Sequence, residues 1–200
     1  MDNIENEFSA EESLKVIRSM IESTKASISD HSHYFLLWGY ATVIGCLLDF
    51  ILLYVVNSPY HYYAWLITIL TFIPHFILLR RDKKHRKVST FINEAIYYVW
   101  VIIGISFWVL NVAFIKIGWE YSFTFFILLY GIGTFISGSL MKFKPMRTGG
   151  IICMFLVALA PYLSFPFQVL LGAVAILISY IIPGHLLRNQ YKANIASYGK

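Results

Sequence analysis

One carboxylate lies in the middle of a very apolar stretch of the chain. Asp49 occurs in segment 45–56, whose sequence is GCLLDFILLYVV. An ionised carboxylate in lipid is costly, so we expect Asp49 either to be protonated or to face water or a cation. Two kinds of chemistry are then open: a neutral acid that ties helices together by hydrogen bonds, or a site that takes up a proton or another cation.

The composition places the chain among membrane proteins. Hydrophobic residues make up 58% of the 200 residues and charged residues only 14%, which lies outside the usual range of soluble domains. Runs of about 20 apolar residues can cross a bilayer as helices. The predicted spans are 34–56, 61–79, 95–115, 119–141, 148–164 and 167–187. We therefore expect an all-α, polytopic membrane helical bundle of six transmembrane helices, arranged as three hairpins.

The basic residues predict the orientation of these spans. Of the 16 Lys and Arg residues, all except Lys116 lie in the two tails and in the connections that follow the second and fourth spans. Cytoplasmic segments carry the excess of Lys and Arg in membrane proteins. Both termini are thus expected in the cytoplasm, with short outer turns at 57–59, 116–118 and 164–166.

Asp49 lies on a helical stripe with Trp38, Thr42, Gly45 and Cys46, which forms a small and polar face. Such a face is expected to turn into the bundle, because small residues let helices approach closely and polar side chains avoid lipid. Asp49 comes eight residues before Asn57, so it should lie about 12 Å inside the outer boundary of the membrane. We expect it to be predominantly neutral at pH 7.

Polar groups at the same depth on neighbouring spans are the candidate partners of Asp49. Thr68 fits on the second span, where it shares a stripe with His75, and Asn111 fits on the third. No Lys or Arg lies at a matching depth. The sequence therefore predicts a buried polar site made by Asp49, Thr68, His75 and Asn111, in which Thr68 or Asn111 bonds the acid.

The polar tail before the first span, residues 1–33, is expected to form a separate cytoplasmic region, and residues 189–200 a second, shorter one. Residues 9–12 (SAEE) have the form of a capping box. Leu14, Ile17 and Ile21 then recur at spacings that share one helical face. These signals predict an amphipathic helix over 10–29. Its apolar face either packs on the cytoplasmic ends of the spans or on the interface, or it binds a cytoplasmic protein or a second copy of the chain.

The connection after the second span is strongly basic, with the sequence RRDKKHRK over 80–87. Positive-inside topology alone requires such a run beside a span. Its side chains are also candidates for contact with the membrane surface or a partner, namely Arg80, Arg81, Lys83 and Lys84. Binding of nucleic acid is not expected.

The sequence contains no nucleotide-binding loop, metal-ligand cluster or nucleophile motif. Cys46 and Cys153 both lie inside spans and have no CxxC spacing, so free buried thiols are expected. The histidines lack paired ligand spacings. We therefore assign no catalytic residue, and expect neither a metal nor a cofactor.

Three short segments of the chain are 36–39 (LLWG), 131–145 (GIGTFISGSLMKFKP) and 180–187 (YIIPGHLL). Together they are similar to an uncharacterised family of small six-helix bacterial inner-membrane proteins. The resemblance implies a multi-pass protein of the bacterial plasma (inner) membrane and supplies no activity, so no functional residue is transferred.

Two classes of function follow from these observations. The chain is either a membrane-embedded interaction or regulatory component, or a small carrier or channel for protons, cations or a small solute that uses Asp49, as a monomer or a homo-oligomer. Transport normally needs several polar sites along a path, and the sequence has few. We therefore favour the interaction component.

Overall fold

The computed structural model describes residues 13–16, 32–85 and 91–198, and every regular element in these ranges is helical. Residues 13–16 form a single helical turn. The η segments are short stretches of 3₁₀ helix (η2, η3) or π-helix (η1, η4). In chain order the elements are α2 (Ser32–Phe50), η1 (Ile51–Val55), η2 (His61–Trp65), α3 (Leu66–His85), α4 (Phe91–Ile117), α5 (Ser122–Leu140), α6 (Lys144–Leu159), η3 (Ala160–Tyr162), α7 (Phe165–Ile176), η4 (Leu177–Ile181) and α8 (Ile182–Tyr198).

Six helical stretches in the described part of the chain are long and apolar enough to cross a membrane. This confirms the prediction of an all-helical chain with six such helices. They are Ser32–Val55, His61–Arg81, Phe91–Ile117, Ser122–Leu140, Lys144–Tyr162 and Phe165–Gln190. The last helix continues beyond the predicted end at residue 187, since α8 runs to Tyr198. Most of the expected C-terminal tail is therefore helical.

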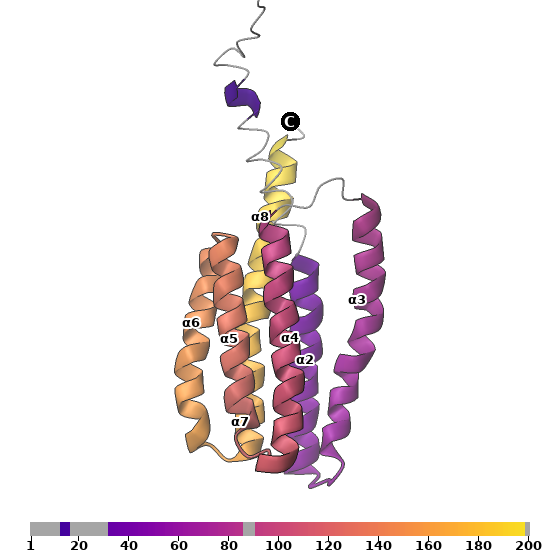
Figure 1. Cartoon of the computed structure of the whole chain (residues 1–200), viewed down its shortest axis with the longest axis vertical. Helices are drawn as coiled ribbons and strands as arrows, with labels where there is room; N and C mark the ends of the chain where they lie inside the picture. Colours follow the sequence, from indigo (N-terminus) through magenta and orange to yellow (C-terminus); the bar gives the residue numbers. More distant parts are fainter. Residues whose placement is uncertain (1–12, 17–31, 86–90, 199–200) are drawn as a thin grey trace, which may run out of the picture.

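The helices lie side by side along one long axis (Figure 1). The start of α2 and the end of α8 lie at one end of the bundle, which we call the terminal end. The turns near residues 57, 118 and 163 lie at the other, which we call the turn end. The first span, α2, lies beside the last, α7 to α8, and α3 stands apart from the other helices at its terminal end.

The turns are short because specific residues end or begin a helix there. Asn57 (φ 55°) and Gly118 (φ 97°) both adopt the left-handed backbone conformation. The Gly118 N–H donates to the Phe114 carbonyl oxygen at 2.9 Å, which is a common way to end a helix. Pro166 lies in the first turn of α7, where its missing N–H costs nothing.

Glycines allow α5 and α6 to pack with their backbones in contact. A Cβ atom added to Gly150 would lie 2.7 Å from the Phe135 backbone nitrogen. One added to Gly138 would lie 2.7 Å from the Arg147 backbone nitrogen. Side chains at these positions would push the helices apart, so the close crossing depends on glycine.

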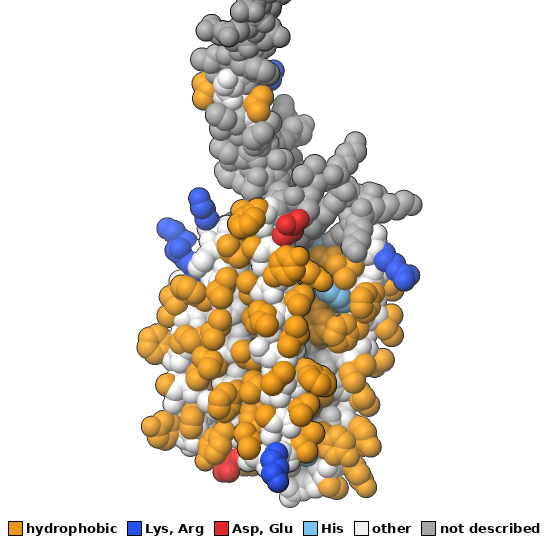
Figure 2. All heavy atoms as spheres, viewed as in Figure 1, with side chains coloured by type: hydrophobic (Ala, Val, Ile, Leu, Met, Phe, Trp, Pro, Cys, Tyr) orange, Lys and Arg blue, Asp and Glu red, His pale blue; other side chains and the backbone are white. Residues whose placement is uncertain are grey.

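Large apolar side chains cover the outside of the bundle between its two ends (Figure 2). The basic side chains visible in this view lie near the ends, mostly the terminal end. By position in the helices, Arg80, Arg81, Lys144 and Arg147 belong to the terminal end, whereas Lys116 follows the long run of α4 at the turn end. An apolar belt with polar ends is the surface expected of a protein surrounded by lipid.

Candidate functional site

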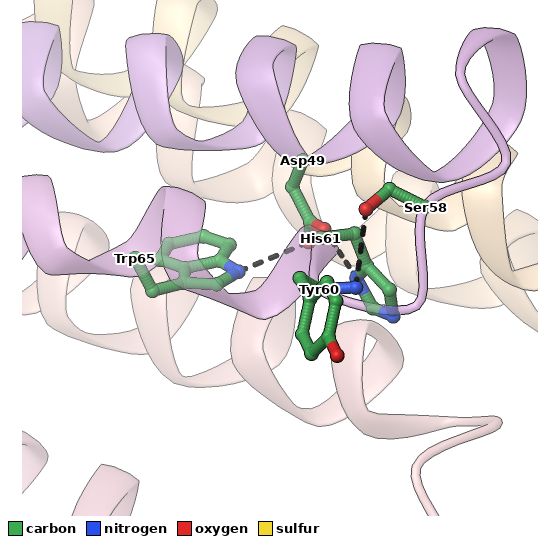
Figure 3. A network of polar contacts seen from close by, with 5 residues as sticks. All are labelled: Asp49, Ser58, Tyr60, His61 and Trp65. Carbon is green, nitrogen blue, oxygen red and sulfur yellow. Dashed lines mark hydrogen bonds and ion pairs between the residues drawn. The ribbon is translucent and has the colours of Figure 1, made fainter.

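Asp49 lies in the interior of the bundle, at the end of α2 that is nearer the turn end, and is only 1% exposed. Its Oδ1 lies 2.6 Å from His61 Nδ1, and its Oδ2 accepts a hydrogen bond from Trp65 Nε1–H at 3.0 Å. Figure 3 shows the carboxyl group pointing from α2 toward both rings on η2. The prediction that Asp49 faces the interior is confirmed.

The local fold brings these rings back over the acid. After α2 the chain forms the π-helical segment η1, turns at Asn57, and returns as η2. Ser58 Oγ accepts a hydrogen bond from the Tyr60 backbone N–H at 3.2 Å, which helps to fix the turn (Figure 3). His61 and Trp65 follow at the start and end of η2, so each can reach one oxygen of the same carboxyl group.

The predicted partners of Asp49 are wrong. Thr68 donates to the Trp65 carbonyl oxygen at 2.7 Å, and Asn111 Nδ2–H donates to the Phe107 carbonyl oxygen at 2.8 Å. Each side chain therefore bonds the backbone of its own segment. Thr68 and Asn111 are the expected partners because they lie at the same depth as Asp49 if the helices are straight. In the structure the His61 and Trp65 rings of η2 instead reach the acid across the short turn.

The contacts define what this group can do chemically. Either His61 Nδ1–H donates to the carboxylate, or a protonated Asp49 donates to the bare Nδ1. A neutral acid with a neutral imidazole and a carboxylate with an imidazolium hold the same number of protons, and both pairs have no net charge. The pair can thus remain uncharged without a Lys or Arg, which suits a site in an apolar bundle.

His61 connects the buried acid to the surface of the bundle. The imidazole is 25% exposed, whereas the Asp49 side chain is 2% exposed. The Trp65 ring packs against Phe123 with centroids 5.9 Å apart, and Phe165 lies 6.4 Å from the His61 ring. The acid is consequently closed in by aromatic side chains on the side away from α2.

His75, the remaining member of the predicted site, belongs to a separate group. Its Nδ1 accepts a hydrogen bond from Trp38 Nε1–H at 3.1 Å, and the Tyr34 ring lies 5.3 Å from its own. Both partners lie on the first span, nearer the terminal end than Asp49 is. The structure therefore does not bring Asp49, Thr68, His75 and Asn111 together.

Further polar contacts link the helices between these two groups. Thr42 Oγ1 donates to the Trp38 carbonyl oxygen at 2.9 Å and lies 3.2 Å from the Tyr130 hydroxyl. Trp100 Nε1–H donates to Ser137 Oγ at 3.1 Å. The Thr42 and Trp100 hydrogen bonds share no residue, so they are separate contacts within or between helices and form no continuous network.

Sequence reasoning missed His61 and Trp65 as functional partners. They look like interfacial aromatic residues beside a turn, which is a common place for such rings. The available signal was their distance from Asp49: they follow it by 12 and 16 residues across a short turn. A hairpin that reverses within a few residues places side chains at such separations opposite each other.

The predicted partner-contact residues are only partly described. Leu14 lies in the helical turn 13–16 and is 65% exposed, whereas Ile17 and Ile21 lie outside the described residues. Arg80 and Arg81 are exposed at the terminal end of α3. Lys83 and Lys84 continue this helix, and their side chains lie outside the described part. Docking of the predicted helix 10–29 stays a prediction.

Metal-ligating side chains do not gather in the part of the chain that the structure describes. No group of three or more His, Cys, Asp or Glu residues there could hold an ion. Cys46 and Cys153 are both buried and unpaired, in separate apolar clusters.

Comparisons of the whole chain with protein-family models, curated proteins and solved structures give no match.

Proposed function

We propose that the chain is a multi-pass protein of a bacterial plasma membrane, with the terminal end in the cytoplasm. The proposal is supported by the six apolar helices and by the distribution of Lys and Arg, since Lys116 alone falls on the turn side. The bacterial setting rests on the resemblance of the short segments 36–39, 131–145 and 180–187.

Cysteine labelling in intact cells tests the orientation. Tyr62→Cys, at an exposed site of the turn end, should react with a membrane-impermeant maleimide from outside. Arg188→Cys, on α8, should react only after permeabilisation. The native Cys46 and Cys153 are 1% and 0% exposed, so the unmodified chain gives a low background. If the reagent labels Arg188→Cys from outside but does not label Tyr62→Cys, the orientation is the opposite of the one proposed.

Within that membrane, we propose that the protein serves as an interaction component rather than as a carrier. The observation that carries this proposal is the exposure of the second and third spans, in each of which only 11% of the most apolar window is buried. Two long helices thus present most of their side chains outward, while the buried Asp49 is bonded to His61 and Trp65 of the same molecule. A lateral surface of this kind fits another membrane helix.

Photo-crosslinking in the native membrane tests the interaction. A photoreactive residue in place of Ile77 on α3 or Ile102 on α4, which are 62% and 58% exposed, should give a defined protein adduct. Tryptophan at the neighbouring Ile73 should abolish the Ile77 adduct while the protein stays folded. Replacement of Val169, which is 0% exposed, provides the control. Adducts to lipid alone at both positions would contradict the proposal.

A proton or cation carrier is the second candidate, and one observation favours it. The partly exposed His61 lies 2.6 Å from the buried Asp49, so a proton could pass between the surface and the acid. The next polar side chain inward on α2 is Thr42, seven residues away, which is about 10.5 Å along the helix. A single hydrogen bond cannot bridge that distance, so the side chains of α2 alone do not continue the path beyond Asp49.

Asp49→Asn in liposomes separates the two candidates. Asparagine keeps an acceptor for Trp65 and much of the shape, so the free energy of unfolding should fall by no more than about 1–2 kcal/mol. Because Asn cannot exchange the proton, any flux through Asp49 should disappear. Thermal stability and ion flux are measured together on wild type and variant. A robust flux that Asp49→Asn abolishes in a folded protein would establish the carrier.

A further inference from the structure

One face of α4 has the spacing of a helix-pairing surface and no neighbour inside the molecule. Its members alternate four and three residues apart, as in left-handed helix pairs. All are exposed, Trp108 by 70% and Ile115 by 76%. A Cβ atom added to Gly104 would meet no atom within 4 Å. The α4 stripe, as we call it, consists of Tyr97, Val101, Gly104, Trp108, Asn111 and Ile115.

Asn111 is the polar member of the α4 stripe. Its Nδ2 donates one hydrogen bond to the Phe107 carbonyl oxygen at 2.8 Å. Among the described residues, its second N–H and its Oδ1 have no hydrogen-bond partner. Asn111 precedes Lys116 by five residues, so it lies about 7.5 Å further along the axis, within the apolar part of the helix. An unpaired amide is costly in hydrocarbon, so it favours a partner that supplies a donor and an acceptor.

The α4 stripe itself indicates the chemistry of that partner. No charged residue occurs on α4 between Glu94 and Lys116, so the stripe cannot form an ion pair with a partner. A carboxamide has a donor and an acceptor and is therefore complementary to a second carboxamide. In two copies inserted the same way and related by a two-fold axis, Asn111 faces Asn111. Gly104, seven residues before it, lets the two backbones approach.

We propose that two copies of this chain associate through the α4 stripe, with paired Asn111 carboxamides at its polar centre. The proposal rests on the proposed interaction function and names its partner as a second copy. A single Asn on a membrane helix sets partner and register in the same way that a buried Asn does in coiled coils. Acyl chains cannot supply the missing hydrogen bonds, which separates a protein partner from lipid.

The full chain in lipid vesicles tests the association. Energy transfer between donor- and acceptor-labelled copies, followed as lipid is added, should report a dimer. Asn111→Leu should raise its dissociation constant about tenfold, and Gly104→Ile should abolish it by keeping the backbones apart. Asn111→Gln should retain most of the association. Val109→Ala, exposed on α4 outside the stripe, should leave it unchanged. Unaltered thermal unfolding of each variant shows that the fold is intact.

Cysteine crosslinking adds the geometry. Ile115→Cys should crosslink to itself in vesicles, whereas Ile77→Cys on α3 should not, although both sites are well exposed. A chain that stays monomeric at every lipid dilution would overturn the inference, as would a dimer insensitive to both Asn111→Leu and Gly104→Ile. If the chain is monomeric and Ile77 still crosslinks to another protein, the dimer is wrong and the interaction function stands.

Discussion

The first and last spans resemble the second and third in hydropathy, yet the protein covers them very differently. In the most apolar window of each span, 44% and 50% of residues are buried in Ser32–Val55 and Phe165–Gln190, against 11% in both His61–Arg81 and Phe91–Ile117. Lipid and protein interior are similarly apolar, so hydropathy alone does not separate a central helix from a peripheral one.

The difference lies in small and polar residues. The covered helices approach through glycines such as Gly172 and Gly184, where an added Cβ would lie 2.9 Å from a side chain of a neighbouring helix. Gly104 on the exposed α4 has open space instead. Helices in this bundle therefore pack closely at glycine positions, where no side chain separates them. The exposed helices carry large apolar side chains that can contact lipid or a partner.

The largest effect should come from adding one methyl group at a close crossing. In Gly150→Ala the new Cβ would lie 2.7 Å from a backbone nitrogen and 2.9 Å from the Gly131 carbonyl oxygen. Since neither can move alone, the free energy of unfolding should fall by about 3 kcal/mol. Gly104→Ala is the matched control, and should be neutral or stabilise α4 by up to about 1 kcal/mol. Reversible unfolding in detergent measures both, and equal effects would mean that the crossing is not tight.

Removal of the buried acid should have the next largest effect. Asp49→Leu leaves His61 Nδ1 and the Trp65 N–H without their shared partner, which should lower the free energy of unfolding by about 2–3 kcal/mol. The exposed neighbour Leu48 gives the control, since Leu48→Ala changes a lipid-facing side chain. If both variants unfold at the same denaturant concentration, the contacts of Asp49 with His61 and Trp65 do not stabilise the turn end.

A smaller effect should distinguish a bonded tryptophan from an unbonded one. Trp65→Phe keeps an aromatic ring near Phe123 but removes the N–H that donates to Asp49, so it should lower the free energy of unfolding by about 1 kcal/mol. Trp108→Phe, at a 70% exposed position of α4, should change it by less than about 0.5 kcal/mol in monomeric, detergent-solubilised protein. The reverse order would show that the hydrogen bond contributes nothing.

The sequence alone determined the helices and the polar face that carries Asp49. Backbone groups in lipid must bond within their own segment, so long apolar runs predict helices whatever their neighbours are. The burial of Asp49 followed from the same local logic, because it shares a face with Thr42 and Gly45.

Only the tertiary structure decided which residues bond Asp49 and which spans lie at the centre. His61 and Trp65 reach the acid because η1, the turn at Asn57 and η2 reverse the chain within a few residues, a geometry that depth counting along straight helices does not contain. The exposure of α3 and α4 was equally hidden, since a side chain that faces lipid and one that faces another helix meet surroundings of the same polarity.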